Sequence, residues 1–245
     1  MKAGETEGRD ASRTSWSMLT VGLSILLLAG QAHAQERIDL RALVRETQIT
    51  SESPNELTMV WWLPEQFWQA SLRDRLPANQ VDEVLKVVRR YTMIAVVDGR
   101  IGPLGGMSFI PEETVRTNVT LKDAAGVNYP PLGESSLDPD MKNLVQAMKP
   151  IVANMLGAIG QNTHFVVFPS KSADGRPVAD AASKGTLWVI VGGKEFRYRL
   201  PLGSLLPPKY DPGTGERFPG NYDFNPFTGT KLGTESPNKP LQPTR

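Results

Sequence analysis

Hydrophobic residues occur along the chain mainly in short runs that are rich in β-branched and aromatic side chains, a pattern typical of strands. The clearest are LTMVWWL and HFVVF, and a Gly-Gly pair between TLWVIV and EFRYRL predicts a β-hairpin. In that hairpin Phe196, Tyr198 and Leu200 are expected to point inward and Arg197 and Arg199 outward. Strands are predicted at residues 57–63, 93–97, 107–110, 114–122, 127–129, 164–168, 186–191 and 195–200, with a further short strand carrying Ile38, Leu40 and Leu43.

Helical periodicity is confined to three places. Residues 64–73 begin with a proline and continue with apolar side chains at helical spacing. Residues 80–90 repeat valine and leucine on one face, with Asn79 as the expected N-cap. The longest apolar face follows Asp138 and Pro139, with an expected kink or break at Pro150 and an end near Gly160.

These elements predict an α+β fold, because the strands join in local hairpins and the helices do not alternate with them. We expect a mostly antiparallel, β-sandwich-like domain with helical insertions and a small C-terminal hairpin. A doubly wound parallel fold is the alternative, against which the hairpins argue. Asp98-Gly99 and Asp123–Gly126 are expected to form turns between strands.

The first 34 residues resemble a secretory signal peptide. Residues 18–30 form an uncharged apolar run, and Ala32 and Ala34 supply the small side chains that signal peptidase requires. Cleavage is expected after Ala34, which would make the protein periplasmic or secreted, with no integral membrane segment afterwards. The run is shorter than the roughly 20 residues of a membrane-spanning helix, although an uncleaved anchor remains an alternative.

The rest of the chain divides by composition. Residues 35–206 are expected to form the main α+β domain, residues 207–233 a small appendage, and residues 234–245 a disordered tail rich in proline and polar residues. The appendage contains a repeat, because Asp211-Pro-Gly-Thr214-Gly recurs 14 residues later as Asn225-Pro-Phe-Thr228-Gly. Phe218 and Leu232 follow the two copies in register.

This repeat resembles a zinc ribbon, whose two knuckles read Cys-Pro-x-Cys-Gly. The prolines, the glycines, an aromatic residue and Lys231-Leu232 match, but the four cysteine positions hold Asp211, Thr214, Asn225 and Thr228. Zinc requires thiolate or imidazole ligands, whereas Asp, Asn and Thr close turns by hydrogen bonding to nearby backbone N–H groups. We therefore expect a metal-free, ribbon-like hairpin. Two unrelated turns, or calcium bound by Asp211, Glu216 and Asp223, are the alternatives.

Composition limits the chemistry of the protein. It has no cysteine and two histidines, of which only His164 follows the leader, so thiol catalysis, iron–sulfur clusters and multi-histidine metal sites are excluded. With 27 Lys+Arg against 26 Asp+Glu, the charge is almost balanced and predicts no attraction to nucleic acid or to an anionic membrane. We expect no cofactor and no metal.

Few residues suggest a functional site. Trp61, Trp62 and Trp68 are candidate binding residues as an aromatic platform, although burial in the core is the favoured interpretation, because Trp61 and Trp62 must face opposite sides of a strand. No sequence motif supplies a nucleophile that His164 could activate, and we expect a structural role for it. Glu112-Glu113 and Asp138/Asp140 are the close carboxylate pairs, and capping explains the second pair.

No catalytic residue is therefore assigned from the sequence. It favours an exported, non-catalytic binding or structural protein of the cell envelope, whose partner is an unidentified envelope protein or polymer. The alternative is a carboxylate-based hydrolase that acts on an envelope glycan or peptide, with the tryptophans binding the substrate.

Overall fold

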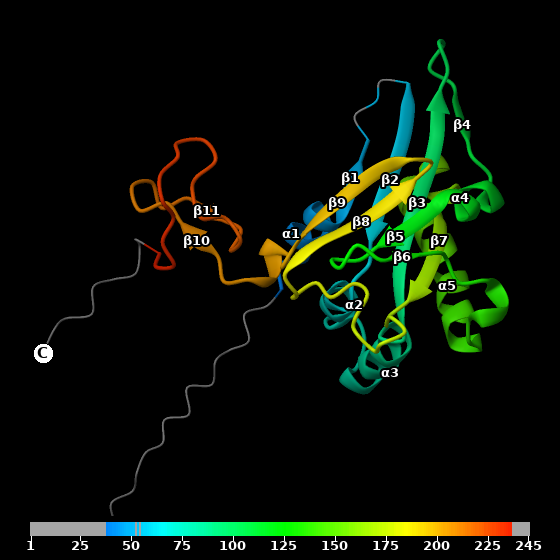
Figure 1. Cartoon of the computed structure of the whole chain (residues 1–245), viewed down its shortest axis with the longest axis horizontal. Helices are drawn as coiled ribbons and strands as arrows, with labels where there is room; N and C mark the ends of the chain where they lie inside the picture. The colour runs from blue at the N-terminus through cyan, green and yellow to red at the C-terminus, as the bar shows by residue number, and fades with distance from the viewer. Residues whose placement is uncertain (1–37, 52, 54, 237–245) are drawn as a thin grey trace, which may run out of the picture. The chain divides into compact units, whose positions relative to one another are not determined.

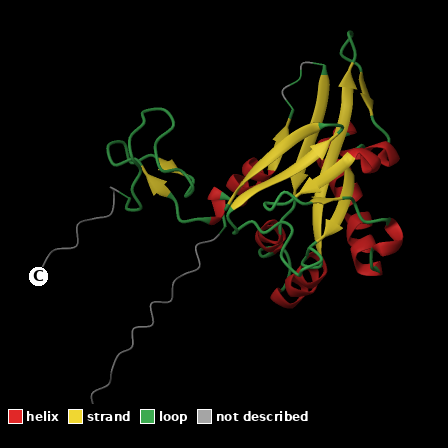
Figure 2. Ribbon diagram, viewed as in Figure 1, coloured by secondary structure: helices red, strands yellow, loops and turns green. Residues whose placement is uncertain are grey.

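The structure is a computed structural model that describes residues 38–51, 53 and 55–236. The chain divides into two units, Met1–Gln35 and Glu36–Arg245, and the description below concerns the second. The expected leader and residues 237–245 of the expected disordered tail lie outside the described residues. Helices and antiparallel sheets are both present, which confirms the predicted α+β class (Figures 1 and 2).

The larger sheet is built around its longest strand, β3. One side of β3 pairs with β2, which in turn pairs with β1, while its other side pairs with β7 near its beginning and with β4 near its end. All of these pairings are antiparallel. The strands are β1 (Gln48–Thr50), β2 (Glu56–Trp62), β3 (Tyr91–Ile101), β4 (Met107–Phe109) and β7 (His164–Pro169).

The second sheet has the strand order β6-β5-β8-β9 and is also antiparallel. Its strands are β5 (Val119–Lys122), β6 (Asn128–Tyr129), β8 (Gly185–Val191) and β9 (Lys194–Leu200). The predicted hairpin is therefore β8–β9. Its residues Phe196 and Tyr198 are buried, Leu200 is partly exposed, and Arg197 and Arg199 are exposed.

The two sheets pack together through buried side chains. Trp62 of β2 meets Tyr198 of β9 edge to face, with 5.6 Å between ring centroids. The Tyr198 hydroxyl donates to the Val60 carbonyl at 3.2 Å, and burial raises the pKa of this phenol. Trp61 lies on the opposite face of β2, where its ring meets Phe67 at 5.1 Å.

The helices cover the remaining faces and ends of the sheets (Figure 2). They are α1 (Leu40–Thr47), α2 (Glu65–Leu72), α3 (Ala78–Val88), α4 (Glu112–Asn118), α5 (Pro139–Leu156) and α6 (Ala158–Gln161), with short 3-10 turns η1 (Glu134–Ser136) and η2 (Gly203–Leu205). Asp138 caps α5 as expected, because its Oδ1 accepts from the Met141 N–H at 2.9 Å. No helix of the described segments is long and apolar enough to cross a membrane.

Two predicted strands contain helices instead. The strand expected at Ile38, Leu40 and Leu43 is α1, which Asp39 caps by accepting from the N–H groups of Arg41 and Ala42. The strand expected over 114–122 is α4 followed by β5, and only its last four residues are extended.

One predicted turn is also wrong. Asp98-Gly99 is not a turn, since β3 runs through it. The Asp98 carboxylate accepts a hydrogen bond from the Thr58 hydroxyl, and a Cβ on Gly99 would lie 2.9 Å from the Ser108 carbonyl oxygen of β4.

Two predicted helix ends also differ from those in the structure. Helix α3 starts at Ala78 after Pro77, so Asn79 lies inside it and is not its N-cap. Helix α5 continues through Pro150 and ends at Gly157, whose φ of +58° favours glycine, three residues before the predicted stop.

Candidate functional sites

The C-terminal repeat forms two turns of the same construction. In the first, Asp211 Oδ1 accepts from the N–H groups of Gly213 (2.8 Å) and Thr214 (3.1 Å), and the Asp211 carbonyl accepts from Gly215 at 2.8 Å. In the second, Asn225 Oδ1 accepts from Phe227 (2.9 Å) and Thr228 (3.4 Å), and the Asn225 carbonyl accepts from Gly229 at 2.8 Å. Each turn is thus closed by the side chain at its first position.

The glycine at the end of each turn is required by its backbone. Gly215 and Gly229 both have φ of +73°, a conformation that side chains with a Cβ rarely adopt. The threonines close the turns further, because Thr214 and Thr228 accept through their hydroxyls from the N–H groups of Glu216 (3.2 Å) and Thr230 (3.3 Å). The repeat in the sequence is therefore a repeat of backbone geometry.

The two turns are joined through the side chains at their first positions. Asn225 Nδ2 donates to Asp211 Oδ2 at 2.7 Å, and both residues are almost completely buried. This bond, followed by the N–H groups of Gly213 and Thr214, holds the pKa of Asp211 below its ordinary value. No group of three or more carboxylate or imidazole ligands close enough for a metal occurs among the described residues.

The strands around these turns form a small hairpin. Strand β10 (Lys209–Tyr210) pairs with β11 (Arg217–Phe218), and isolated bridges join Tyr210 to Gly233 and Phe224 to Lys231. Phe218 and Leu232, the residues in register after the two turns, are both buried. We call residues 207–233 the C-terminal module.

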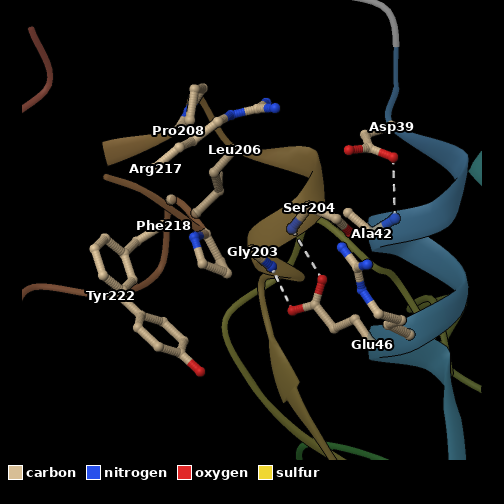
Figure 3. Close-up of a pocket in the computed structure, with 13 residues that line it drawn as sticks. Asp39, Ala42, Glu46, Gly203, Ser204, Leu206, Pro208, Arg217, Phe218 and Tyr222 are labelled. Atoms are coloured by element: carbon tan, nitrogen blue, oxygen red, sulfur yellow. Dashed lines mark hydrogen bonds between the residues drawn. The ribbon is translucent and has the colours of Figure 1, made fainter. Parts of the chain in front are cut away.

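A cleft lies where this module meets α1 and η2 (Figure 3). Its volume is about 350 Å³. The module contributes Phe218 and Tyr222, whose rings stack with 6.5 Å between centroids and 24° between planes. Polar side chains line the rest, chiefly Asp39, Arg45 and Glu46 of the α1 segment. Such a mixture of aromatic and polar side chains in a concave surface is typical of a binding site.

The walls of the cleft are fixed by tight contacts. Glu46 accepts from the N–H groups of Gly203 (2.6 Å) and Ser204 (2.9 Å), which ties α1 to the first turn of η2. The module is held to η2 by Gly220, whose N–H donates to the Gly203 carbonyl at 3.1 Å. A Cβ on Gly220 would lie 2.4 Å from both Leu206 Cβ and the Pro207 carbonyl oxygen, so only glycine permits this approach.

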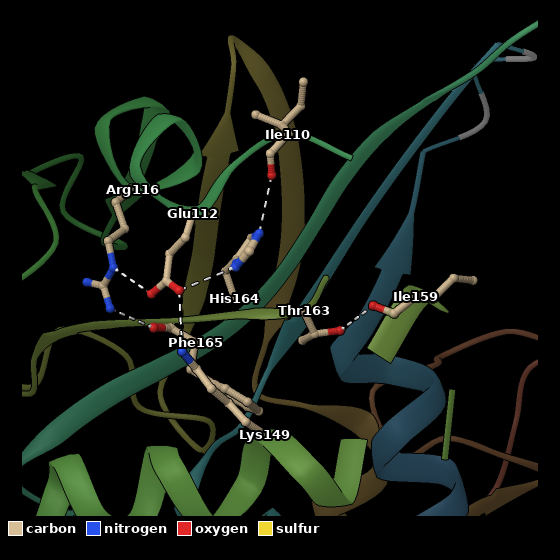
Figure 4. A network of polar contacts seen from close by, with 8 residues as sticks. All are labelled: Ile110, Glu112, Arg116, Lys149, Ile159, Thr163, His164 and Phe165. Atoms are coloured by element: carbon tan, nitrogen blue, oxygen red, sulfur yellow. Dashed lines mark hydrogen bonds and ion pairs between the residues drawn. The ribbon is translucent and has the colours of Figure 1, made fainter. Parts of the chain in front are cut away.

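A second polar cluster surrounds Glu112 at the start of α4 (Figure 4). Its carboxylate accepts from Arg116 Nε at 3.2 Å and Lys149 Nζ at 3.3 Å, and lies 3.7 Å from His164 Nδ1. Burial raises the pKa of Glu112, but the bonds from Arg116 and Lys149 outweigh burial and lower it overall. The cluster joins α4, α5 and β7.

His164 is engaged at both ring nitrogens. Nε2 lies 3.3 Å from the Ile110 carbonyl oxygen, and Nδ1 faces Glu112. Arg116 also donates to the Phe165 carbonyl at 3.2 Å. These contacts hold α4 against β7, which is a sufficient structural role for the histidine.

The candidate tryptophans lie mostly inside the protein. Trp62 and Trp68 are 1% and 3% exposed, and Trp61 is half-buried against Phe67. Trp62 nevertheless borders a cavity of about 220 Å³ that Glu65 and Asp180 also line. Glu65 is paired with Arg89 at 2.6 Å, and Asp180 Oδ1 accepts from the Ala182 N–H at 2.9 Å.

The cleft residues Glu46 and Tyr222 were not candidates from the sequence. Glu46 follows the segment that the sequence predicts as a strand, and no local pattern indicates its contact with η2. Tyr222 lies between the two repeats and outside their register. A comparison of this chain with models of protein families, with curated proteins and with solved structures finds no match.

Proposed function

We propose that the protein is an exported, non-catalytic binding or structural module of the cell envelope, which holds a segment of its partner in the cleft between α1 and the C-terminal module. The cleft is the observation that carries this proposal. It combines a stacked aromatic pair with charged side chains, and its walls are held by Glu46 and Gly220 in a defined arrangement. The leader-like N-terminus supports export.

Tyr222 is the residue with which to test the cleft. Its side chain is 41% exposed, so its loss should leave the core intact. The tagged chain beginning at Gln35 and its Tyr222→Ala variant are used to capture partners from envelope extract. We expect one partner that the parent chain retains and the variant loses. The matched control is Val127→Ala, an equally accessible apolar residue, 44% exposed, in the β5–β6 loop. Equal capture by all three chains would contradict the proposal.

A carboxylate-based hydrolase is the second candidate function, and the cavity beside Trp62 favours it. Glu65 and Asp180 both line that cavity, as an acid and a base acting on one substrate would. The test is turnover of envelope glycans and peptides by the parent chain and by Glu65→Gln and Asp180→Asn. Turnover that both variants abolish would support the enzyme, whereas turnover unaffected by either would rule out this cavity.

A further inference from the structure

The two turns of the C-terminal module provide an internal comparison, because they have the same backbone and differ in their side chains. At the third position the first turn has Gly213 and the second has Phe227, and both N–H groups donate to the side chain that closes the turn, at 2.8 and 2.9 Å. The turn therefore forms equally well without a phenylalanine. Folding of this module gives no reason for the phenyl ring of Phe227, which is 83% exposed.

The neighbouring side chains share this exposure. Phe224 is 57% exposed and forms the bridge with Lys231 on the adjacent segment. Residues paired across an antiparallel bridge project from the same face, so the side chains of Phe224 and Lys231 leave the hairpin on one face. Asp223, next to Phe224, accepts from Lys209 Nζ at 2.7 Å, and the charge of Lys231 also helps to lower the pKa of Asp223. Phe224, Phe227 and Lys231 are called the aromatic tip below.

We infer that the aromatic tip inserts into the surface of a lipid bilayer. Two exposed phenylalanines lie three positions apart, and exposed Thr228, Thr230 and Lys231 follow them, so one short surface segment combines apolar rings with polar groups. Amphipathic elements at a bilayer surface have this arrangement: aromatic side chains enter the headgroup region, and lysine contacts anionic headgroups. The centre of a protein-binding surface is instead a packed apolar patch inside a polar rim.

The hydrogen bonds of the turn suit it to this role. Asn225 and the Thr228 hydroxyl fix the backbone on both sides of Phe227, so little conformational freedom remains to be lost when the ring is inserted. The overall charge of the chain is almost balanced, which provides no long-range attraction to a membrane. Attachment must therefore depend on apolar insertion, with Lys231 adding a local, salt-sensitive contribution.

The experiment is sedimentation of the chain beginning at Gln35 with vesicles. One set contains phosphatidylethanolamine and phosphatidylglycerol, and the other phosphatidylcholine alone. Phe227→Gly, which copies the first turn, should lower the partition coefficient on both sets by about tenfold to a hundredfold, the usual effect of one buried aromatic ring. Lys231→Gln should weaken binding by about fivefold, and only on anionic vesicles.

The matched control is Leu104→Gly, which removes another apolar side chain that is almost fully exposed, in the loop between β3 and β4. It should bind both kinds of vesicle as the parent chain does. Failure of the parent chain to bind either kind, or equal binding by Phe227→Gly, would overturn the inference. Loss of the captured partner by Phe227→Gly without vesicle binding would also overturn it, and would assign the aromatic tip to a protein surface. Vesicle binding does not involve Tyr222, so it fails or succeeds separately from the cleft.

Discussion

The buried bond between Asn225 and Asp211 permits a stringent test of how the C-terminal module is held together. Asn225→Ala removes the bond donated to Asp211 and the two that Asn225 Oδ1 accepts from Phe227 and Thr228. A net contribution of roughly 1 kcal/mol for each hydrogen bond, less for the long one at 3.4 Å, gives a loss of about 2 to 3 kcal/mol. Because the hydrophobic core cluster contains no residue of the C-terminal module, this loss should appear as local opening of the module.

Hydrogen exchange measures that opening directly. Amides of the second turn, such as those of Phe227 and Gly229, should exchange about 30- to 150-fold faster in Asn225→Ala, while amides of β3 and β8 should be unchanged. Asn143→Ala, at an exposed position of α5, is the control. Unchanged protection of the second turn would show that these side-chain bonds do not hold the module.

Exchanging the two partners makes the test more specific. Asn225→Asp would place a second carboxylate opposite Asp211, where the two polar atoms are now 2.7 Å apart. The repulsion between the two charges should make the folded state bind a proton more readily. Protection should then be poor at neutral pH and should recover as the pH falls. Asp211→Asn leaves two amide donors facing each other. The double variant Asp211→Asn with Asn225→Asp restores one donor and one acceptor, and it should recover most of the protection. A double variant as open as the single ones would refute the pairing.

Three further predictions concern other contacts. The hydroxyl of Tyr91 and the N–H of Met141 hold the pKa of Asp138 below its ordinary value of 3.8, so the stabilisation exists at neutral pH and is lost as the pH falls through the folded-state pKa. The urea midpoints of the parent chain and Asp138→Asn should therefore differ at pH 7 and converge in acid, and a difference that does not change with pH would exclude this linkage. Gly220→Ala should displace the module and expose residues 203–220 to proteolysis. Gly213→Ala should not, because its new Cβ would meet nothing closer than 3.4 Å. Equal resistance of the two variants to proteolysis would mean that the close approach at Gly220 is dispensable. A variant with Asp211→Cys, Thr214→Cys, Asn225→Cys and Thr228→Cys should bind one zinc ion per chain by plasma emission analysis, while the parent chain binds none. A variant that binds no zinc would contradict the knuckle geometry.

The sequence predicts best those features that depend on neighbouring residues. The β8–β9 hairpin, the cap of α5 and the hydrogen bonds within the two C-terminal turns all join residues a few positions apart, so the pattern contains them. Helix α1 shows the limit. Leu40, Leu43 and Thr47 repeat at helical spacing after the cap Asp39, but over eight residues that signal is hard to distinguish from a strand.

Contacts between distant segments were not predictable in this way. Glu112 meets His164, and Glu46 meets Gly203, only because separate elements are brought together by the packing of the sheets. Gly99 is the clearest example of this influence. Because it follows Asp98, it resembles the glycine of a hairpin turn, yet it lies within β3. Glycine is required there because β4 approaches too closely for a side chain.

The difference between local contacts and contacts of distant residues also explains the sequence of the repeat. Asp211 and Asn225 occupy equivalent positions, and the sequence gives no reason for the difference between them. In the structure each side chain uses one oxygen to close its own turn and presents its second polar atom to the other residue. Two aspartates would present two acceptors, and two asparagines two donors. A metal allows both knuckles to carry the same ligand, but a hydrogen bond requires them to differ. The asymmetry is therefore what a turn pair joined by a hydrogen bond demands.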